Sequence, residues 1–147
     1  MKLLVQNKKA RFDFELHYEY EAGIELFGFE VKALRTGKGT LEGAHVIVRG
    51  GEAYLVNASI SPHQPANAPK NYEPERVRRL LLSHKGITEL NNTSNQKGLT
   101  IVPLMLYSTG RNIKLRFAVA RRKKKQDKRE SIKKRDTQRD IARTLKK

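Results

Sequence analysis

Apolar and polar residues alternate without a break over residues 12–20. A period of two is typical of a strand with one buried face, so this segment is predicted to be a strand. Residues 21–23 interrupt the alternation, and the aromatic residues beyond them follow the opposite phase, which predicts a bulge beside Gly28. Residues 31–35 predict a short helical turn that ends near Gly37.

Two hairpins are predicted from turn signals that lie between strand-like segments. Residues 45–48 and 52–60 flank a glycine pair, whose positive φ suits a tight turn. Residues 99–107 and 112–120 form the second hairpin around a short turn that also contains glycine. Pro103 lacks a backbone donor, so its strand is predicted to lie at an edge or to carry a bulge there.

The segment between the hairpins is predicted to contain a proline-rich loop and one helix. Four prolines within residues 62–74 mark the loop, and residues 76–90 are predicted to be helical. Three consecutive leucines, residues 80–82, would span about 200° of that helix, more than one buried stripe uses. Leu81 or Leu82 is therefore predicted to present apolar surface outside the core.

Five or six strands with few helices indicate a mainly β protein. We predict an OB-like closed antiparallel β-barrel over residues 1–120, with short flanking helices. A two-layer sheet with helices packed on one face is the alternative. Residues 121–147 are predicted to form a basic C-terminal tail outside this domain.

Positive charge is concentrated in the tail. The formal net charge is +16 over 147 residues, and residues 121–147 hold 14 Lys and Arg against four acids. A segment this basic, with no aromatic residue, is predicted to be disordered when free and to need a polyanion for order. The chain has no cysteine and no apolar run long enough for a membrane span or a signal peptide, which favours a cytoplasmic nucleic-acid-binding protein.

No set of residues predicts an enzyme. Acids at positions 13, 15, 19 and 21 could hold Mg²⁺ for RNA cleavage, but strand alternation alone produces such a row. The four histidines lie far apart without metal-ligand spacing. We therefore predict no catalytic residue, no metal site and no cofactor.

Clusters of basic residues suit contacts with phosphates, which set affinity without reading sequence. An exposed apolar side chain beside them would suit contact with an unpaired base. RNA is therefore the predicted partner. The clusters are Lys8 with Arg11, Lys32 with Arg35 and Lys38, and Arg76 with Arg78 and Arg79.

Seven short motifs occur in order along the chain, and an eighth lies in the tail. They are residues 7–11 (NKKAR), 20–24 (YEAGI), 30–35 (EVKALR), 51–55 (GEAYL), 60–62 (ISP), 79–82 (RLLL) and 97–104 (KGLTIVPL), with the pattern D-K-R-x-x-I-K-x-R over residues 127–135. In sequence and spacing, they resemble the small protein B family, the SsrA (tmRNA)-binding proteins of bacteria. The resemblance covers nearly the whole chain.

This resemblance implies an OB-like barrel that binds the transfer-RNA-like domain of tmRNA and catalyses nothing. In the family, the complex reaches stalled ribosomes with elongation factor Tu when tmRNA is alanylated, for ribosome rescue by trans-translation. The tail then occupies the empty mRNA channel, by the decoding region of the 16S rRNA, as a helix. The residues implied to bind RNA are Glu21, Leu81, Leu82 and Ser83, with Lys8, Arg11, Lys32, Arg35 and Lys38 near the RNA backbone. The residues implied to engage the ribosome are Lys123, Lys124, Asp127, Lys128, Arg129, Ile132, Lys133 and Arg135.

Several positions depart from the family pattern. Family members commonly have His and Tyr where this chain has Phe12 and Phe14, and many have Tyr at His45 and Asn at Ser83. Some have histidine at Gln126 and tryptophan at Asp136. The tail is therefore expected to rely on charge and helix geometry in place of stacking.

Two rival functions belong to other classes. A ribosomal protein of OB type also combines a barrel with a basic tail, and selective binding to tmRNA over ribosomal RNA fragments would separate the two. An RNA-cleaving enzyme would show Mg²⁺-dependent cleavage that is lost when Glu15 and Glu19 become Gln.

Overall fold

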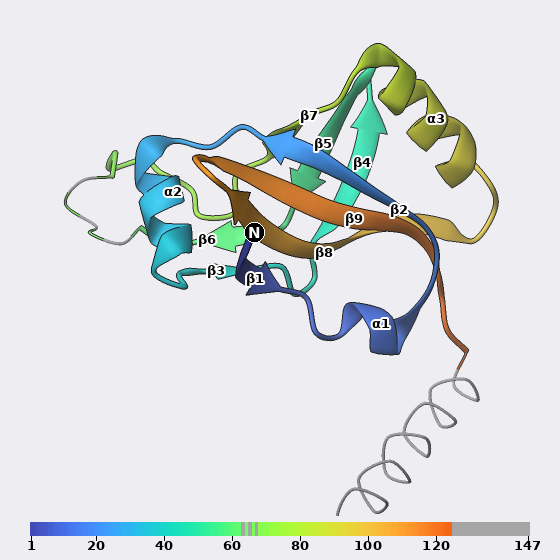
Figure 1. The fold of residues 1–147 in the computed structure, drawn as a ribbon, viewed down its shortest axis with the longest axis horizontal. Helices are drawn as coiled ribbons and strands as arrows, with labels where there is room; N and C mark the ends of the chain where they lie inside the picture. The colour runs from blue at the N-terminus through green and yellow to red at the C-terminus, as the bar shows by residue number, and fades with distance from the viewer. Residues whose placement is uncertain (63, 65, 67, 125–147) are drawn as a thin grey trace, which may run out of the picture.

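The protein is built mainly from antiparallel strands with a few short helices (Figure 1). The computed structural model describes residues 1–62, 64, 66 and 68–124. The helices are α1 (Ala10–Asp13), α2 (Gly28–Arg35) and α3 (His84–Ser94). The strands are β1 (Lys2–Gln6), β2 (Phe14–Ile24), β3 (Gly39–Thr40), β4 (His45–Arg49), β5 (Glu52–Val56), β6 (Ser59–Ile60), β7 (Arg78–Leu81), β8 (Leu99–Thr109) and β9 (Asn112–Arg122).

Most strands of the described residues join one antiparallel sheet in the order β1-β8-β4-β5-β7-β2-β9, and β8 also pairs with β9. The strands β3 and β6 pair separately. The β8–β9 ladder shifts register between Pro103 and Met105, which confirms the predicted bulge. The strand β8 is not an edge strand, because it also pairs with β4 at Ile101 and with β1 from Met105 to Ser108.

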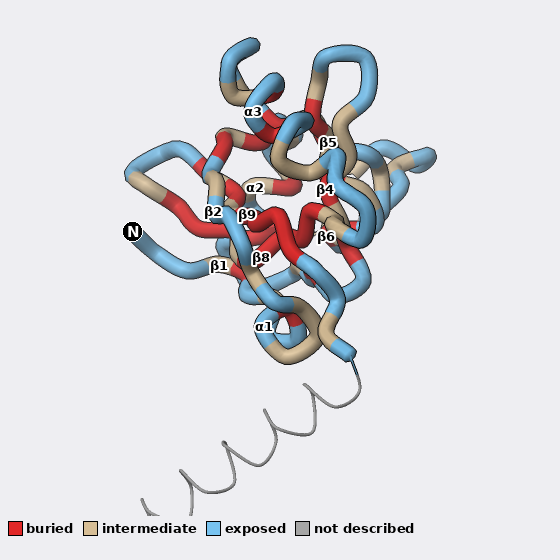
Figure 2. Tube along the Cα trace, turned by 90° about the vertical axis from the view of Figure 1, so that its right-hand side faces the viewer, coloured by how far each residue is buried: buried red, intermediate tan, exposed pale blue. Residues whose placement is uncertain are grey.

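Both faces of β8 contact other parts of the protein, which explains its long apolar run. Ile101 and Phe117 belong to the main core, where the ring of Tyr20 stacks on that of Phe117 at 5.8 Å between centroids. Val102, which points the other way, packs with Ala10 of α1 in a second cluster. Figure 2 shows the resulting buried stretches along β8 and β9. The interior thus lies on both sides of these two strands.

Both predicted hairpins are confirmed, β4–β5 and β8–β9. Arg49 pairs with Glu52 across a two-residue turn in which Gly50 and Gly51 have φ values of 61° and 77°. Positive φ at both central residues is typical of a type I′ turn, whose twist matches that of the strands. In the β8–β9 turn, Gly110 has a φ of 60°. Glycine therefore supplies the positive φ that each hairpin turn requires.

The segment over residues 76–90 differs from the predicted helix. Its first part is the strand β7, in which Arg78 and Leu80 are buried while Leu81 is exposed, a period of two. β7 pairs with β5 on one side and β2 on the other, so tertiary pairing decides its conformation. The helix α3 begins only after Ser83, whose hydroxyl accepts a hydrogen bond from the Gly86 N–H at 3.0 Å.

Three further expectations along α1, β2 and α2 are wrong. The strand β2 continues through residues 21–23 to Ile24 instead of breaking there, and Phe12 lies in α1 instead of a strand. Gly28 is the first residue of α2 and not a bulge. The short helix predicted over residues 31–35 is confirmed, because α2 ends at Arg35.

A buried carboxylate, that of Glu30, holds α2 against the rest of the fold. Glu30 accepts hydrogen bonds from the Phe27 backbone N–H at 2.7 Å, from Arg78 Nη2 at 2.7 Å and from the Tyr72 hydroxyl at 2.9 Å. Arg76 also donates to it. Burial alone would raise the pKa of Glu30, but hydrogen bonds from Arg76, Phe27 and Arg78 outweigh it, so the pKa lies below its ordinary value. The charged network ties α2 to β7.

Candidate nucleic-acid interface

The strands β2, β7 and β9 bring Glu21 and Leu81 to the same side of the sheet. Gly23 pairs with Leu81 on β7 and with Lys114 on β9, while Glu21 pairs with Arg116. Residues that pair across strands share a face, as do residues two apart along one strand. Glu21, Leu81, Lys114 and Arg116 therefore form one surface, called here the Glu21–Leu81 face. Leu81 is 49% exposed on it.

The protein itself supplies polar partners for Glu21. The Tyr107 hydroxyl donates a hydrogen bond to its carboxylate, and Arg116 Nη2 and Lys114 Nζ lie 3.8 Å and 4.0 Å from it. The hydrogen bond from Tyr107 is the main cause of a Glu21 pKa below the ordinary value. Partial burial acts in the opposite direction, and the charges of Lys114 and Arg116 lower the pKa further. The folded protein thus favours the ionised form of Glu21 through its own side chains. Its side chain is still 52% exposed, so it remains accessible to a ligand.

The residues that follow Leu81 have structural contacts of their own. Leu82 is partly buried and packs against the main core. Ser83 is exposed, and its hydroxyl caps α3. A contact from Ser83 to RNA would therefore have to share this oxygen with the helix cap.

The basic residues predicted to contact phosphates lie in two places (Figure 1). Lys32 and Arg35 are exposed on α2, and Lys38 is exposed in the turn after it. Lys8 and Arg11 lie at α1, where Arg11 Nη2 is 3.5 Å from Glu19 Oε1. Within the described part of the chain, the other four cations make no ion pair, which leaves their charge available to a polyanion.

The third basic cluster is not a free cationic patch, contrary to expectation. Arg78 is fully buried on Glu30, and Arg76 bonds to the same carboxylate. Arg79 Nη2 lies 2.8 Å from Glu25 Oε1. These arginines are therefore used inside the fold, because acids distant in sequence lie beside them.

Sequence reasoning missed the contribution of β9. Lys114 and Arg116 occupy the polar positions of an alternating strand, and such positions usually face solvent without further role. Their approach to Glu21 comes from the β2–β9 register over about a hundred residues of sequence separation. Two of the acids predicted to form a row along β2 lie beside basic side chains. Glu15 Oε1 is 3.9 Å from His17 Nε2, and Glu19 pairs with Arg11.

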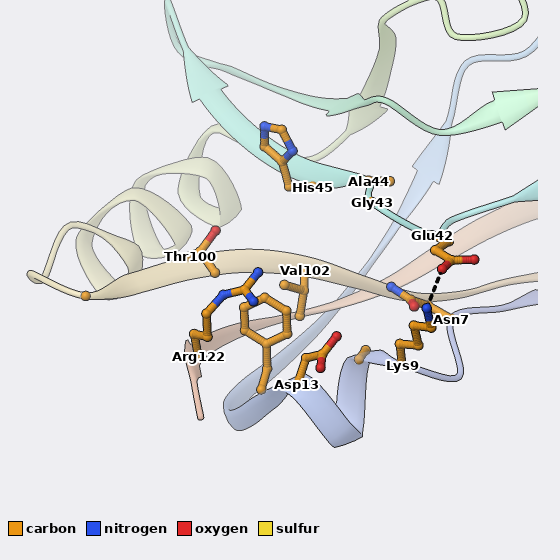
Figure 3. A pocket seen from close by; sticks show the side chains of 13 residues that line it. Asn7, Lys9, Asp13, Glu42, Gly43, Ala44, His45, Thr100, Val102 and Arg122 are labelled. Atoms are coloured by element: carbon orange, nitrogen blue, oxygen red, sulfur yellow. Dashed lines mark ion pairs between the residues drawn. The ribbon is translucent and has the colours of Figure 1, made fainter. Parts of the chain in front are cut away.

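A separate hollow of about 670 Å³ lies between α1, the start of β4, the first residues of β8 and the end of β9 (Figure 3). Two positions that depart from the family pattern, Phe14 and His45, both line it. The Arg122 guanidinium lies over the Phe14 ring at 5.1 Å, and Lys9 Nζ is 2.7 Å from Glu42 Oε1. None of the residues predicted to bind RNA lines this hollow.

Only the first two tail residues predicted to engage the ribosome, Lys123 and Lys124, lie within the described residues. The Lys123 backbone N–H donates to the Asp13 carbonyl oxygen at 2.8 Å, which attaches the end of β9 to α1. The predictions for Gln126 and Asp136 and for the other tail residues lie outside the described part of the chain; those residues are Asp127, Lys128, Arg129, Ile132, Lys133 and Arg135.

The described residues contain no group of three or more His, Asp or Glu side chains placed to hold a metal ion. They also contain no helix that is long and apolar enough to cross a membrane.

Comparison with known proteins gives consistent results. The chain matches the family described as "SmpB protein" over residues 4–147. It is 49% identical to an SsrA-binding protein of Synechococcus sp. (strain JA-2-3B'a(2-13)) over 146 residues, covering 99% of this chain and 95% of that protein. An SsrA-binding protein of Gloeobacter violaceus is 47% identical over 144 residues, covering 98% and 94%.

A solved structure described as "tmRNA-SmpB: a journey to the center of the bacterial ribosome" has the same fold. Its TM-score is 0.69 at 39% identity, and the match covers 86% of this chain and 92% of that one. The chain therefore belongs to the SmpB protein family.

Proposed function

We propose that this protein is a non-catalytic RNA-binding factor that binds the tRNA-like domain of tmRNA and brings it to stalled ribosomes for rescue by trans-translation. The observation that carries the proposal is the Glu21–Leu81 face, where an ionised carboxylate, an exposed leucine and two cations lie on adjacent strands. The relatives compared above are SsrA-binding proteins, and the description of the similar solved structure names tmRNA, SmpB and the bacterial ribosome. This family match favours tmRNA binding over the role of an OB-type ribosomal protein.

The sheet is proposed to be a closed barrel of OB type that acts as a rigid platform. The strand pairings support closure, because they run from β8 through β4, β5, β7, β2 and β9 and return to β8. In a closed sheet, the positions of Glu21 and Leu81 are fixed from both sides. A rigid platform lowers the entropy that is lost on binding.

Base contacts are assigned to the Glu21–Leu81 face, and backbone contacts to the cations around it. A carboxylate such as that of Glu21 can accept hydrogen bonds from base amino groups, and Leu81 offers an apolar surface to an unpaired base. Leu82 and Ser83, which lie between β7 and α3, would extend this contact beyond the end of β7. The cations proposed to lie near the RNA backbone are Lys8, Arg11, Lys32, Arg35 and Lys38.

The basic tail, predicted as residues 121–147, is proposed to act on the ribosome with the part that follows the end of β9 at Arg122. It would enter the mRNA channel and lie near the decoding region of the 16S rRNA, where phosphates surround it. Elongation factor Tu would accompany the complex through alanylated tmRNA. With these partners, the protein is proposed to act in the bacterial cytoplasm.

A binding competition tests the proposal directly. The full chain should bind the tRNA-like domain of tmRNA more tightly than a duplex of equal length or a ribosomal RNA fragment, measured at one stated salt concentration. Glu21→Ala should weaken binding to the tRNA-like domain by about tenfold while the melting temperature changes little. Equal affinity for all three RNAs would contradict the proposed function.

A further inference from the structure

A groove of about 380 Å³ opens beside Glu21 and shares Leu81 and Lys114 with the Glu21–Leu81 face. It lies between β7, α2 and the β8–β9 turn, which come together at one end of the sheet (Figure 1). Its lining combines apolar side chains, among them Leu26, Val31 and Leu81, with the cations Arg111 and Lys114. A concave apolar surface with a few polar groups is the usual form of a ligand site.

Gly23 explains how the apolar floor forms. A Cβ atom added to Gly23 would lie only 3.3 Å from Leu81 Cδ1. The glycine therefore lets the leucine side chain lie across β2, where it lines the groove. Leu81 is 49% exposed there, so it presents an apolar surface in the groove.

The cations in the lining connect the groove to Glu21. Lys114 Nζ lies 4.0 Å from Glu21 Oε1, so the groove and the carboxylate share this lysine. Arg111 is exposed in the turn and makes no ion pair among the described residues. An apolar floor with an unpaired cation above it suits a ligand that is flat and apolar on one side and anionic on the other.

We propose that this groove holds one unpaired nucleotide of the bound RNA. Its base would lie against Leu81, Leu26 and Val31, while Arg111 and Lys114 contact the flanking phosphates. The inference rests on the proposed function, because it places a nucleotide of the same RNA beside the same face. It adds the β8–β9 turn to the interface and assigns Arg111 to it.

Arg111→Ala tests the phosphate contact against a matched control. Arg49 is also an exposed arginine at a glycine turn, but in the β4–β5 hairpin at the other end of the sheet from α2 (Figure 1). Binding to the tRNA-like domain of tmRNA is measured over a salt series. Arg111→Ala should reduce the slope of log K against log salt by about 1, while Arg49→Ala should leave the slope unchanged. Equal slopes for the two variants would overturn the assignment of Arg111.

Abasic substitutions test the base. A set of tRNA-like domains, each with one unpaired nucleotide made abasic, should contain one position that weakens wild-type binding at least fivefold. This loss should shrink when Val31→Ala removes part of the groove wall, in a variant with a normal melting temperature. If no abasic position couples to Val31, the groove does not hold a base, even when Arg111 contacts a phosphate. If the wild type does not prefer the tRNA-like domain over duplex RNA, the proposed function itself fails.

Discussion

Glu30 and Arg78 form a buried ion pair that connects α2 to β7. Neither side chain has exposed surface, and both are fully hydrogen-bonded. Arg78→Met would leave the carboxylate of Glu30 buried with fewer donors. We expect a loss of about 3–5 kcal/mol in the free energy of unfolding, measured with urea. Arg79→Met provides the control, because Arg79 pairs with Glu25 at the surface and should cost far less. Equal losses for the two variants would contradict a structural role for the buried pair.

The low pKa of Glu30 also predicts how stability depends on pH. A carboxyl whose pKa is lower in the folded protein stabilises it above the unfolded pKa, about 4.3 for glutamate. That contribution is lost as the pH falls through the folded pKa. As the pH is lowered below about 4.3, the urea concentration at the unfolding midpoint should therefore decrease. The difference in this midpoint between wild type and Glu30→Gln should shrink over the same pH range. A constant difference from pH 7 to pH 3 would show that ionisation of Glu30 is not involved.

At the scale of elements, β7 shows what the sequence pattern could and could not predict. The two hairpins were predictable because glycine turns and alternation lie within a few residues of each other. In contrast, β7 contains the buried Arg78, and a pattern that treats arginine as polar cannot place it in the core. Its partner, Glu30, lies 48 residues earlier. The leucines were therefore assigned to a helix, although the exposure of one of them was predicted.

The alternation in β7 gives neighbouring leucines different roles. Leu80 is fully buried, and Leu80→Ala should cost about 2–5 kcal/mol in the free energy of unfolding. Leu81→Ala should instead lower affinity for the tRNA-like domain with little change in the urea midpoint, because Leu81 is half exposed. Each variant is measured in both assays. If both substitutions reduce stability equally, and neither lowers the affinity for RNA by more than the loss of folded protein explains, Leu81 is not an RNA contact.

The candidate site was predictable only in part, for the same reason. Glu21 and Leu81 were singled out through motifs, whereas their neighbours Lys114 and Arg116 were not. Each of those cations occupies an ordinary solvent-facing position of β9, and only the pairing with β2 places it beside an acid. The local pattern identifies the faces of strands, and the strand order decides which faces meet.

At the scale of the whole molecule, the described domain and the tail are predicted to be separable. The strand β9 ends at Arg122, and the Lys123 N–H still donates a hydrogen bond to the Asp13 carbonyl oxygen. A truncated variant that ends at Lys124 therefore keeps all of β9 and this hydrogen bond. The shortened chain should keep its melting temperature and bind the tRNA-like domain, but it should not support tagging on stalled ribosomes. A full-length chain with residues 125–147 in scrambled order keeps the charge and provides the control. Full tagging by the shortened chain would contradict a ribosomal role for the tail.

The long ladder between β2 and β9 has a consequence for the synthesis of the protein. β2 ends at Ile24, but its partner β9 begins only at Asn112, so the edge of β2 that pairs with β9 stays unpaired until residues beyond Asn112 have been made. At about 5–20 residues per second, that delay is on the order of ten seconds. The β8–β9 hairpin is local and can form within microseconds of its emergence. Nascent chains that stop before Asn112 are therefore expected to keep an open strand edge that is prone to aggregation.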